Sequence, residues 1–307
     1  MKPRQIYEML PARLRVRAKA VLGGAGHGRS WLDGLKARDS AMGKKRLDRS
    51  AQDMAQRFSA SGITEVAGKS CMEFGAGYVP SEALIFHLMG ASRVVATDYN
   101  ALGQFDQLFA AAIACDRAKF LGAVEKFGDA KKAEERLDTL CRLGKRRGVS
   151  YLKQVIEYVA PHDMSQTPIK GTFDIINSVS VLEHIPPSAA ISILQNLRTS
   201  LSSVGVMAHV IDMRDHLDLE GNPLGFLARD TDYVPDRDFD VRGNRLRKGD
   251  WMKLFCCLPD TNTTCSWEQA LDASKIPPVL LPDFVGLSCD EARVGIVLML
   301  SRSCETT

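Results

Sequence analysis

Short apolar runs alternate with longer amphipathic stretches from about residue 68 to the end of the chain. Apolar runs bounded by Gly, Pro or polar residues and separated by helical stretches are typical of parallel strands that alternate with helices. The predicted strands cover residues 70–74, 93–97, 154–159, 173–177, 206–211 and 294–301. The predicted helices of this part of the chain cover residues 81–89 and 248–257. The pattern therefore indicates an α/β fold with a doubly wound, mostly parallel sheet.

The N-terminal part of the chain has a different pattern. Apolar residues at helical spacing with interleaved arginines predict a basic helix over residues 5–22, and a second helix is expected at 46–60. We interpret residues 1–61 as a helical N-terminal extension. It either packs as a lid beside the main domain or contacts an anionic partner, including the surface of a membrane.

The main domain is expected to cover residues 62–307 and to carry two insertions. The first is a helical, Lys/Arg-rich segment at about 101–147, and the second is a loop-rich segment at about 213–260. Both are expected to form a cap over the site where a substrate binds.

Charge is distributed unevenly along the 307 residues. The net charge is +3, but residues 1–50 hold thirteen Lys/Arg and four Asp/Glu, which leaves about −6 for the remainder. With only 7% aromatic residues and a local basic region, the chain lacks the aromatic-interleaved basic surface of a nucleic-acid-binding protein. We therefore expect no nucleic-acid partner.

No apolar run approaches the roughly 20 residues needed to span a bilayer, and no signal-peptide pattern follows Met1. A cytoplasmic location without a transmembrane segment is expected. The eight cysteines have neither Cys-x-x-Cys pairs nor His-partnered ligand spacing, so we interpret them as reduced thiols that bind no metal.

The most informative stretch is Glu-Phe-Gly-Ala-Gly-Tyr-Val-Pro-Ser at 73–81, where a predicted strand runs into a glycine turn and a helix. Gly75 and Gly77 allow the backbone to approach a ligand, as in doubly wound folds that bind nucleotides. The third glycine of a dinucleotide fingerprint is absent. Glu73 disfavours a pyrophosphate and favours a ligand that carries positive charge.

Asp98 ends the second predicted strand and lies 21 residues after Gly77. This spacing is close to that at which an acid accepts hydrogen bonds from ribose hydroxyls. The turn and the acid together predict a nucleoside-containing ligand. The alternative is a purely structural turn with an Asp at the end of a strand.

The stretches 73–77 and 173–185, together with Asp98, resemble motifs of class I S-adenosylmethionine-dependent methyltransferases, and the resemblance covers about residues 68–212. It implies a Rossmann-like, seven-stranded sheet with S-adenosylmethionine as the cofactor. The glycine turn would hold the methionine end of the cofactor, Asp98 the ribose, and Asp163 the adenine amine. The gap from Asp98 to Asp163 is longer than is usual in the family. The cofactor-binding residues that we predict are Glu73, Gly75, Gly77, Asp98, Tyr99, Asp163 and Ser178.

Three histidines near the ends of the fourth and fifth predicted strands are candidate catalytic residues. His184 is interpreted either as a base or substrate contact, or as a residue that caps the loop before the next helix. His209 or His216, oriented by Asp212, is a candidate base for an acceptor that must lose a proton. The alternative places His209 partly buried in a strand and His216 in a solvated turn.

Some relatives bind a metal through Glu-x-x-Glu-His, but Ser180 occupies the first acidic position here, so no metal is expected. Arg242, Arg245 and Arg247 either clamp a phosphate or carboxylate of the acceptor, or belong to a solvated basic loop.

The sequence thus predicts methyl transfer to an oxygen or nitrogen atom of a small-molecule or carrier-linked acceptor. Residues 221–227 resemble the acceptor side of bacterial small-molecule methyltransferases, some of which act in surface-glycan or lipid pathways. Two alternatives remain, an NAD-dependent oxidoreductase and a non-catalytic nucleoside-binding module that acts by binding a partner.

Overall fold

The computed structural model describes residues 47–304, and the helix expected at 5–22 lies outside this range. Within it the strands form a seven-stranded sheet in the order β3-β2-β1-β4-β5-β7-β6, and β7 runs antiparallel to both of its neighbours. This is the predicted Rossmann-like, doubly wound and mostly parallel fold. The strands are β1 (Ser70–Phe74), β2 (Arg93–Thr97), β3 (Glu157–Val159), β4 (Phe173–Val179), β5 (Leu201–Asp212), β6 (Thr261–Ala270) and β7 (Val294–Ser303).

The predicted bounds hold for β1 and β2 and shift for the other strands. β1 and β2 begin and end as predicted, and every residue after the first of each strand is buried. β3 is shorter than predicted because helix α9 (Gly144–Val155) continues into the expected strand. β6 was not predicted because its sequence is mostly polar and its residues are exposed or half-buried.

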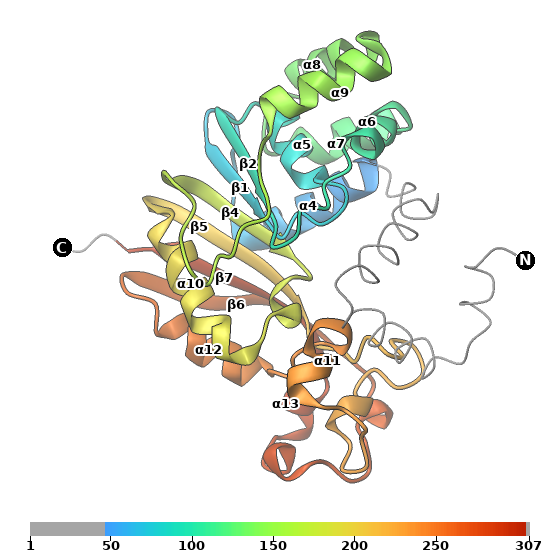
Figure 1. The fold of residues 1–307 in the computed structure, drawn as a ribbon, viewed down its shortest axis with the longest axis vertical. Helices are drawn as coiled ribbons and strands as arrows, with labels where there is room; N and C mark the ends of the chain where they lie inside the picture. The colour runs from blue at the N-terminus through green and yellow to red at the C-terminus, as the bar shows by residue number, and fades with distance from the viewer. Residues whose placement is uncertain (1–46, 305–307) are drawn as a thin grey trace, which may run out of the picture.

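Helices cover both faces of the sheet (Figure 1). One face carries α4 (Leu47–Ser61), α5 (Ser81–Met89) and the helices α6 (Phe105–Ile113), α7 (Arg117–Val124), α8 (Ala130–Arg142) and α9. The opposite face carries α10 (Ala190–Thr199) and α12 (Lys248–Cys256), whose Trp251 and Phe255 are fully buried. The apolar side chains of the two faces form separate cores.

The helices between β2 and β3 pack on α4 and α5. α7 contacts α4, α8 contacts α5, and the Phe58 ring packs against Phe86 and Phe127 at centroid distances of 6.0 and 5.7 Å. α4 is therefore part of the same hydrophobic core as α5. The division of the chain at residue 61 and the capping role of the 101–147 insertion remain predictions.

The segment after β5, which we call the cap after its predicted role, has its own apolar cluster of Leu224, Phe226, Leu227 and Tyr233. It contains α11 (Pro235–Arg242) and α13 (Cys289–Ala292), which lie together beyond the end of the sheet in Figure 1. Residues after β6 also pack on this cluster, among them Ile276 and Phe284. Within the expected segment 213–260, α12 packs on the sheet, and residues from 271 onward join the cluster; the capping role of the segment stays a prediction.

The order of the strands defines a switch point. From β1 the chain proceeds through β2 and β3 to one side, and from β4 through β5 to the other. The carboxyl ends of β1 and β4 therefore flank the position at which open α/β sheets bind ligands.

Candidate functional site

The glycine turn after β1 lies at this switch point. Gly75 and Gly77 have φ values of +76° and +59°, a conformation that favours glycine. The amides of Gly75 and Ala76 donate to the carbonyl of Thr97 at 2.9 and 3.0 Å, which joins the turn to the end of β2. A Cβ atom on Gly75 would lie 2.3 Å from Cγ2 of Val181, in the loop after β4. The loops after β1 and β4 therefore meet at Gly75.

The carboxylate of Asp98 closes the same turn. Its Oδ2 accepts a hydrogen bond from the Gly77 amide at 2.8 Å, and its Oδ1 accepts one from the Asn100 amide at 2.8 Å. A carboxylate offers about four acceptor positions, so Asp98 retains capacity for further donors. The half-buried Asp98 side chain thus stabilises the turn through the Gly77 amide and still has acceptor positions for a ligand.

Glu73 is 7% exposed, and its Oε2 accepts a hydrogen bond from the Ala83 amide in the first turn of α5 at 2.8 Å. A carboxylate at this position stabilises the helix N-terminus. The nearby Glu82 is hydrogen-bonded to Asn177 and Arg57. The Glu73 carboxylate therefore supports the start of α5, and its contact with a cofactor remains a prediction.

The loop after β3 lies beside Asp98, because the His162 amide donates to the Asp98 carbonyl at 2.9 Å. Asp163 follows directly, and its Oδ1 accepts from the amide and hydroxyl of Ser165 at 2.9 and 2.7 Å. Tyr99 is 68% exposed. The structure thus brings Gly77, Asp98 and the 162–163 segment together, as the cofactor prediction requires, while the contacts themselves are untested.

Ser178 and His209 do not lie at the edge of the sheet. The Ser178 hydroxyl is 2.7 Å from Nδ1 of His209, both side chains are buried, and the imidazole packs on Phe255 at 5.6 Å. Burial lowers the pKa of His209 to about 3. Side chains alternate between the faces of a strand, and both residues point into the core that contains α12. The structure therefore places both side chains in this core, where His209 is fully buried, and their assignment to the site stays a prediction.

His184 and His216 meet at the carboxyl ends of β4 and β5. His184 belongs to the short helix η1 (Leu182–His184), and its ring lies 4.8 Å from that of His216 at an interplanar angle of 65°. Glu183 completes the group, since ligand atoms of Glu183, His184 and His216 lie within 4.8 Å of one another. Sequence reasoning missed Glu183, although its place beside His184 in the motif was the available signal.

The carboxyl groups of this cluster differ in charge state. Burial raises the pKa of Glu183 to about 8, and the neighbouring Asp212 carboxylate adds to the rise. Burial alone would also raise the pKa of Asp212, but the hydrogen-bonded Arg214 and the nearby His216 ring hold it well below its usual value. Arg214 binds both Asp212 oxygens at 2.8 and 2.6 Å, and His216 Nε2 lies 3.6 Å from Oδ2. Asp212 therefore remains charged beside a nearly neutral Glu183 at pH 7.

Two of the three arginines expected to clamp an acceptor are buried structural residues. Arg242 forms an ion pair with Asp215 in which both side chains are under 5% exposed. Arg247 is 2% exposed and donates to the carbonyls of Met213 and Ala292 at 2.6 and 3.1 Å. Arg245 packs over the Tyr233 ring at 4.2 Å. The clamp interpretation is therefore wrong for Arg242 and Arg247, because their donors are used within the cap.

The cap is connected to the histidine cluster by Asn244. Its amide group donates to the carbonyls of Leu182 and Ile185 at 2.8 and 3.0 Å, and its backbone amide donates to the Glu183 carbonyl at 2.7 Å. These bonds hold η1 from both ends. The cap thereby fixes the backbone that carries Glu183 and His184.

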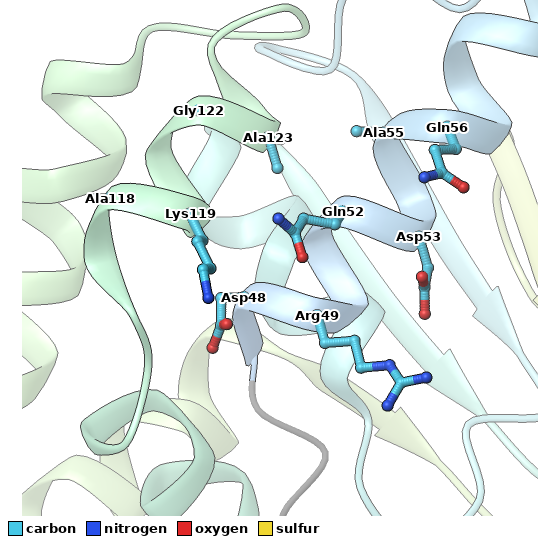
Figure 2. Close-up of a pocket in the computed structure, with 10 residues that line it drawn as sticks. All are labelled: Asp48, Arg49, Gln52, Asp53, Ala55, Gln56, Ala118, Lys119, Gly122 and Ala123. Carbon is cyan, nitrogen blue, oxygen red and sulfur yellow. The ribbon is translucent and has the colours of Figure 1, made fainter.

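A separate hollow of about 690 Å³ lies between α4 and α7. Figure 2 shows its polar side chains, which include Arg49, Gln52, Asp53 and Lys119. It contains none of the predicted site residues, so its size does not make it the candidate site.

No helix within residues 47–304 is long and apolar enough to cross a membrane.

No family model matches the chain, and no curated protein matches it. The chain is similar to an S-adenosylmethionine-dependent methyltransferase from Mesorhizobium loti, with 14% identity over 81% of this chain and 97% of that chain, and a TM-score of 0.42. It is also similar to the magnesium protoporphyrin IX methyltransferase of Synechocystis, solved with S-adenosylhomocysteine, with 12% identity over 83% and 82% of the chains and a TM-score of 0.41.

A further similar structure is the N-methyltransferase NodS of Bradyrhizobium japonicum, also solved with S-adenosylhomocysteine. Its identity to this chain is 14% over 85% of this chain and 90% of that chain, and the TM-score is 0.40.

Proposed function

We propose that this protein binds S-adenosylmethionine at the switch point between β1 and β4 and transfers its methyl group to an oxygen or nitrogen atom of an acceptor. The observation that carries the proposal is the glycine turn at 75–77, which is closed by the Asp98 carboxylate through the Gly77 amide. The turn offers backbone groups that no side chain covers, and Asp98 offers open acceptor positions. A nucleoside with a charged amino-acid tail requires both.

In this proposal Asp98 binds the ribose hydroxyls. Two of its acceptor positions are used by the Gly77 and Asn100 amides, and the remaining positions accept from the ribose diol. The methionine end of the cofactor lies along the glycine turn, whose position is fixed because Gly75 lets the Val181 side chain pack directly against the backbone. Asp163, next to the Asp98 loop, is retained as the adenine contact.

The acceptor binds on the other side of the glycine turn, against Glu183, His184 and His216. Methyl transfer is an in-line displacement in which an acceptor lone pair attacks the methyl carbon while the carbon–sulfur bond breaks, giving S-adenosylhomocysteine. The protein chiefly aligns these atoms. An acceptor that carries a proton must lose it in this part of the site, and the acceptor class that we propose is a small or carrier-linked metabolite.

Calorimetric titration of the full chain with S-adenosylmethionine, S-adenosylhomocysteine and NADH tests the proposal. The wild type should bind the first two at micromolar concentration, and Asp98→Ala should weaken binding about 100-fold, since hydrogen bonds to a charged group contribute about 1.5–3 kcal/mol each. Asp106→Ala is the matched control, because Asp106 is an exposed α6 carboxylate paired with Lys145.

Failure of the folded wild type to bind S-adenosylmethionine would overturn the proposal. Tighter binding of NADH would favour the oxidoreductase. Cofactor binding without methyl transfer in a screen of hydroxyl and amine acceptors would favour the non-catalytic module.

A further inference from the structure

The cluster beside the glycine turn has the composition of a metal site. Glu183 and His184 come from η1, and His216 comes from the segment after β5, 32 residues further along the chain. One ligand atom from each lies within 4.8 Å of the other two. One carboxylate and two imidazoles are the protein ligands of many catalytic zinc sites and of non-haem iron sites. Small side-chain rotations would bring such atoms to one ion.

The burial of Glu183 is a second, independent indication. The residue is 1% exposed, and neither carboxylate oxygen has a hydrogen bond of normal geometry among the described residues, although the Ser180 side chain and the backbone at Asp212 lie near it. Buried carboxyl oxygens with such poorly formed hydrogen bonds are costly, and native proteins satisfy nearly all buried polar groups. A cation bound between Glu183 and the two imidazoles would satisfy them.

The surroundings of His216 agree with this interpretation. Metal-ligating histidines donate their other ring N–H to a carboxylate, which orients the ring. Asp212 offers such a carboxylate 3.6 Å from His216 Nε2, and Arg214 fixes its position through two hydrogen bonds. Asp212 can thus orient His216 while the other ring nitrogen faces the ion.

We propose that Glu183, His184 and His216 bind one divalent transition-metal cation and that this cation ligates an acceptor hydroxyl. Ser180 stands where some relatives have an acidic ligand, and His216 supplies the third ligand instead. Three protein ligands leave coordination positions open for the acceptor. The role assigned to the acceptor rests on the proposed methyl transfer, whereas binding of the ion does not.

The cation would replace a strong base in the reaction. A hydroxyl bound to a divalent cation has a lowered pKa and releases its proton to water. The oxygen lone pair then attacks the methyl carbon of S-adenosylmethionine as the carbon–sulfur bond breaks, and the products are a methyl ether and S-adenosylhomocysteine. The proposal therefore selects an oxygen nucleophile.

Titration of the full chain, dialysed against a chelator, with MnCl₂ and CoCl₂ tests the site directly. Electron paramagnetic resonance measures free Mn²⁺, and visible absorption measures the coordination of Co²⁺. We expect one ion per wild-type chain. Glu183→Gln, His184→Asn and His216→Asn should each weaken binding at least about 100-fold, because the loss of an outer-shell partner alone costs about 10–100-fold. Asp212→Asn should cause a smaller loss, about tenfold.

His162→Asn is the matched control, because His162 lies after β3 and bonds to the Thr167 carbonyl. Its metal binding should equal that of the wild type. Wild-type protein that binds no ion, or binding that survives Glu183→Gln and His216→Asn in folded protein, would overturn the proposal. Circular dichroism and S-adenosylmethionine binding report folding of the variants. Wild-type protein that binds S-adenosylmethionine but no metal rejects the metal site, whereas wild-type protein that binds metal but no S-adenosylmethionine rejects the proposed function.

Discussion

The two halves of the proposed site are built from different chemical groups. The proposed cofactor half, at Gly75, Gly77 and Asp98, consists of backbone groups, glycines and a single carboxylate that bonds to the turn itself. The proposed acceptor half, at Glu183, His184, Asp212 and His216, consists of ionisable side chains from two separate segments of the chain. The first half is a local structure, whereas the second depends on the cap.

This difference separates binding from chemistry. A turn that spans three residues and the end of a neighbouring strand forms whenever β1 and β2 pair, so the cofactor half needs few long-range contacts. The acceptor half requires Asn244, in the cap, to hold η1 in place. Variants can therefore damage one half while sparing the other.

The largest effect is expected from Arg242→Met, which leaves Asp215 buried without its partner. Removing one member of a buried ion pair costs about 3–5 kcal/mol, so the free energy of unfolding measured with urea should fall by that amount. The exposed pair Arg117–Asp138 provides the control, and Arg117→Met should cost less than about 1 kcal/mol.

The same variant sharpens the comparison of the halves. If the cap supports only the acceptor half, Arg242→Met should weaken Mn²⁺ binding and leave S-adenosylmethionine affinity within about twofold. Adding Asp215→Leu to Arg242→Met should restore stability, because it removes the buried carboxylate that Arg242→Met leaves unpaired. Equal losses in both affinities would refute the division.

A smaller effect is expected from Gly75→Ala, which targets the junction of the halves. The left-handed backbone costs a non-glycine residue about 1–2 kcal/mol, and the overlap of the new Cβ with Val181 costs about 1–3 kcal/mol more. S-adenosylmethionine affinity measured by calorimetry should fall by about tenfold or more. Adding Val181→Ala should recover the part that is due to overlap.

Gly122→Ala is the control for this substitution. Gly122 lies within α7, and a Cβ atom there would meet nothing within 4 Å. Alanine is favoured over glycine in a helix, so affinity should not change and stability should rise slightly. If Val181→Ala does not restore the S-adenosylmethionine affinity of Gly75→Ala, the overlap of the new Cβ atom with Val181 is not the cause of the lost affinity.

The smallest effect concerns His209 and the pH dependence of stability. Its imidazole is neutral in the fold because burial lowers the pKa to about 3, while the unfolded chain takes up a proton below about 6.5. Stability is therefore complete above pH 6.5 and is lost as the pH falls toward 3. Between pH 8 and pH 5 this residue accounts for about 2 kcal/mol.

His209→Asn should remove that share, which urea denaturation of both proteins at pH 8 and pH 5 would reveal. His87, whose pKa is lowered to about 4 by burial and by Arg136, remains in both proteins and cancels in the comparison. An unchanged pH dependence in the variant would contradict the buried, neutral state. Methyl-transfer pH profiles should be the same in both, since His209 lies outside the acceptor half.

Sequence patterns predicted the elements from β1 to β2 more accurately than the elements that follow them. β1, α5 and β2 were predicted to the residue because their apolar runs are buried on both sides and end at glycine, proline or Asp98. β6 escaped prediction because an edge strand needs no apolar run. Glu183 was missed because His216 follows 33 residues later, and only the folded chain shows that their ligand atoms lie within 4.8 Å of each other.

The position of β7 bears on how the chain folds during synthesis. β6 is made before β7, yet among the described strands its only neighbour in the sheet is β7, which separates it from β5. While residues 294–303 are still in the ribosome tunnel, β5 and β6 each present an unpaired edge, and such edges invite non-native association. A nascent chain of this protein should therefore depend on chaperone protection until Ser303 has emerged.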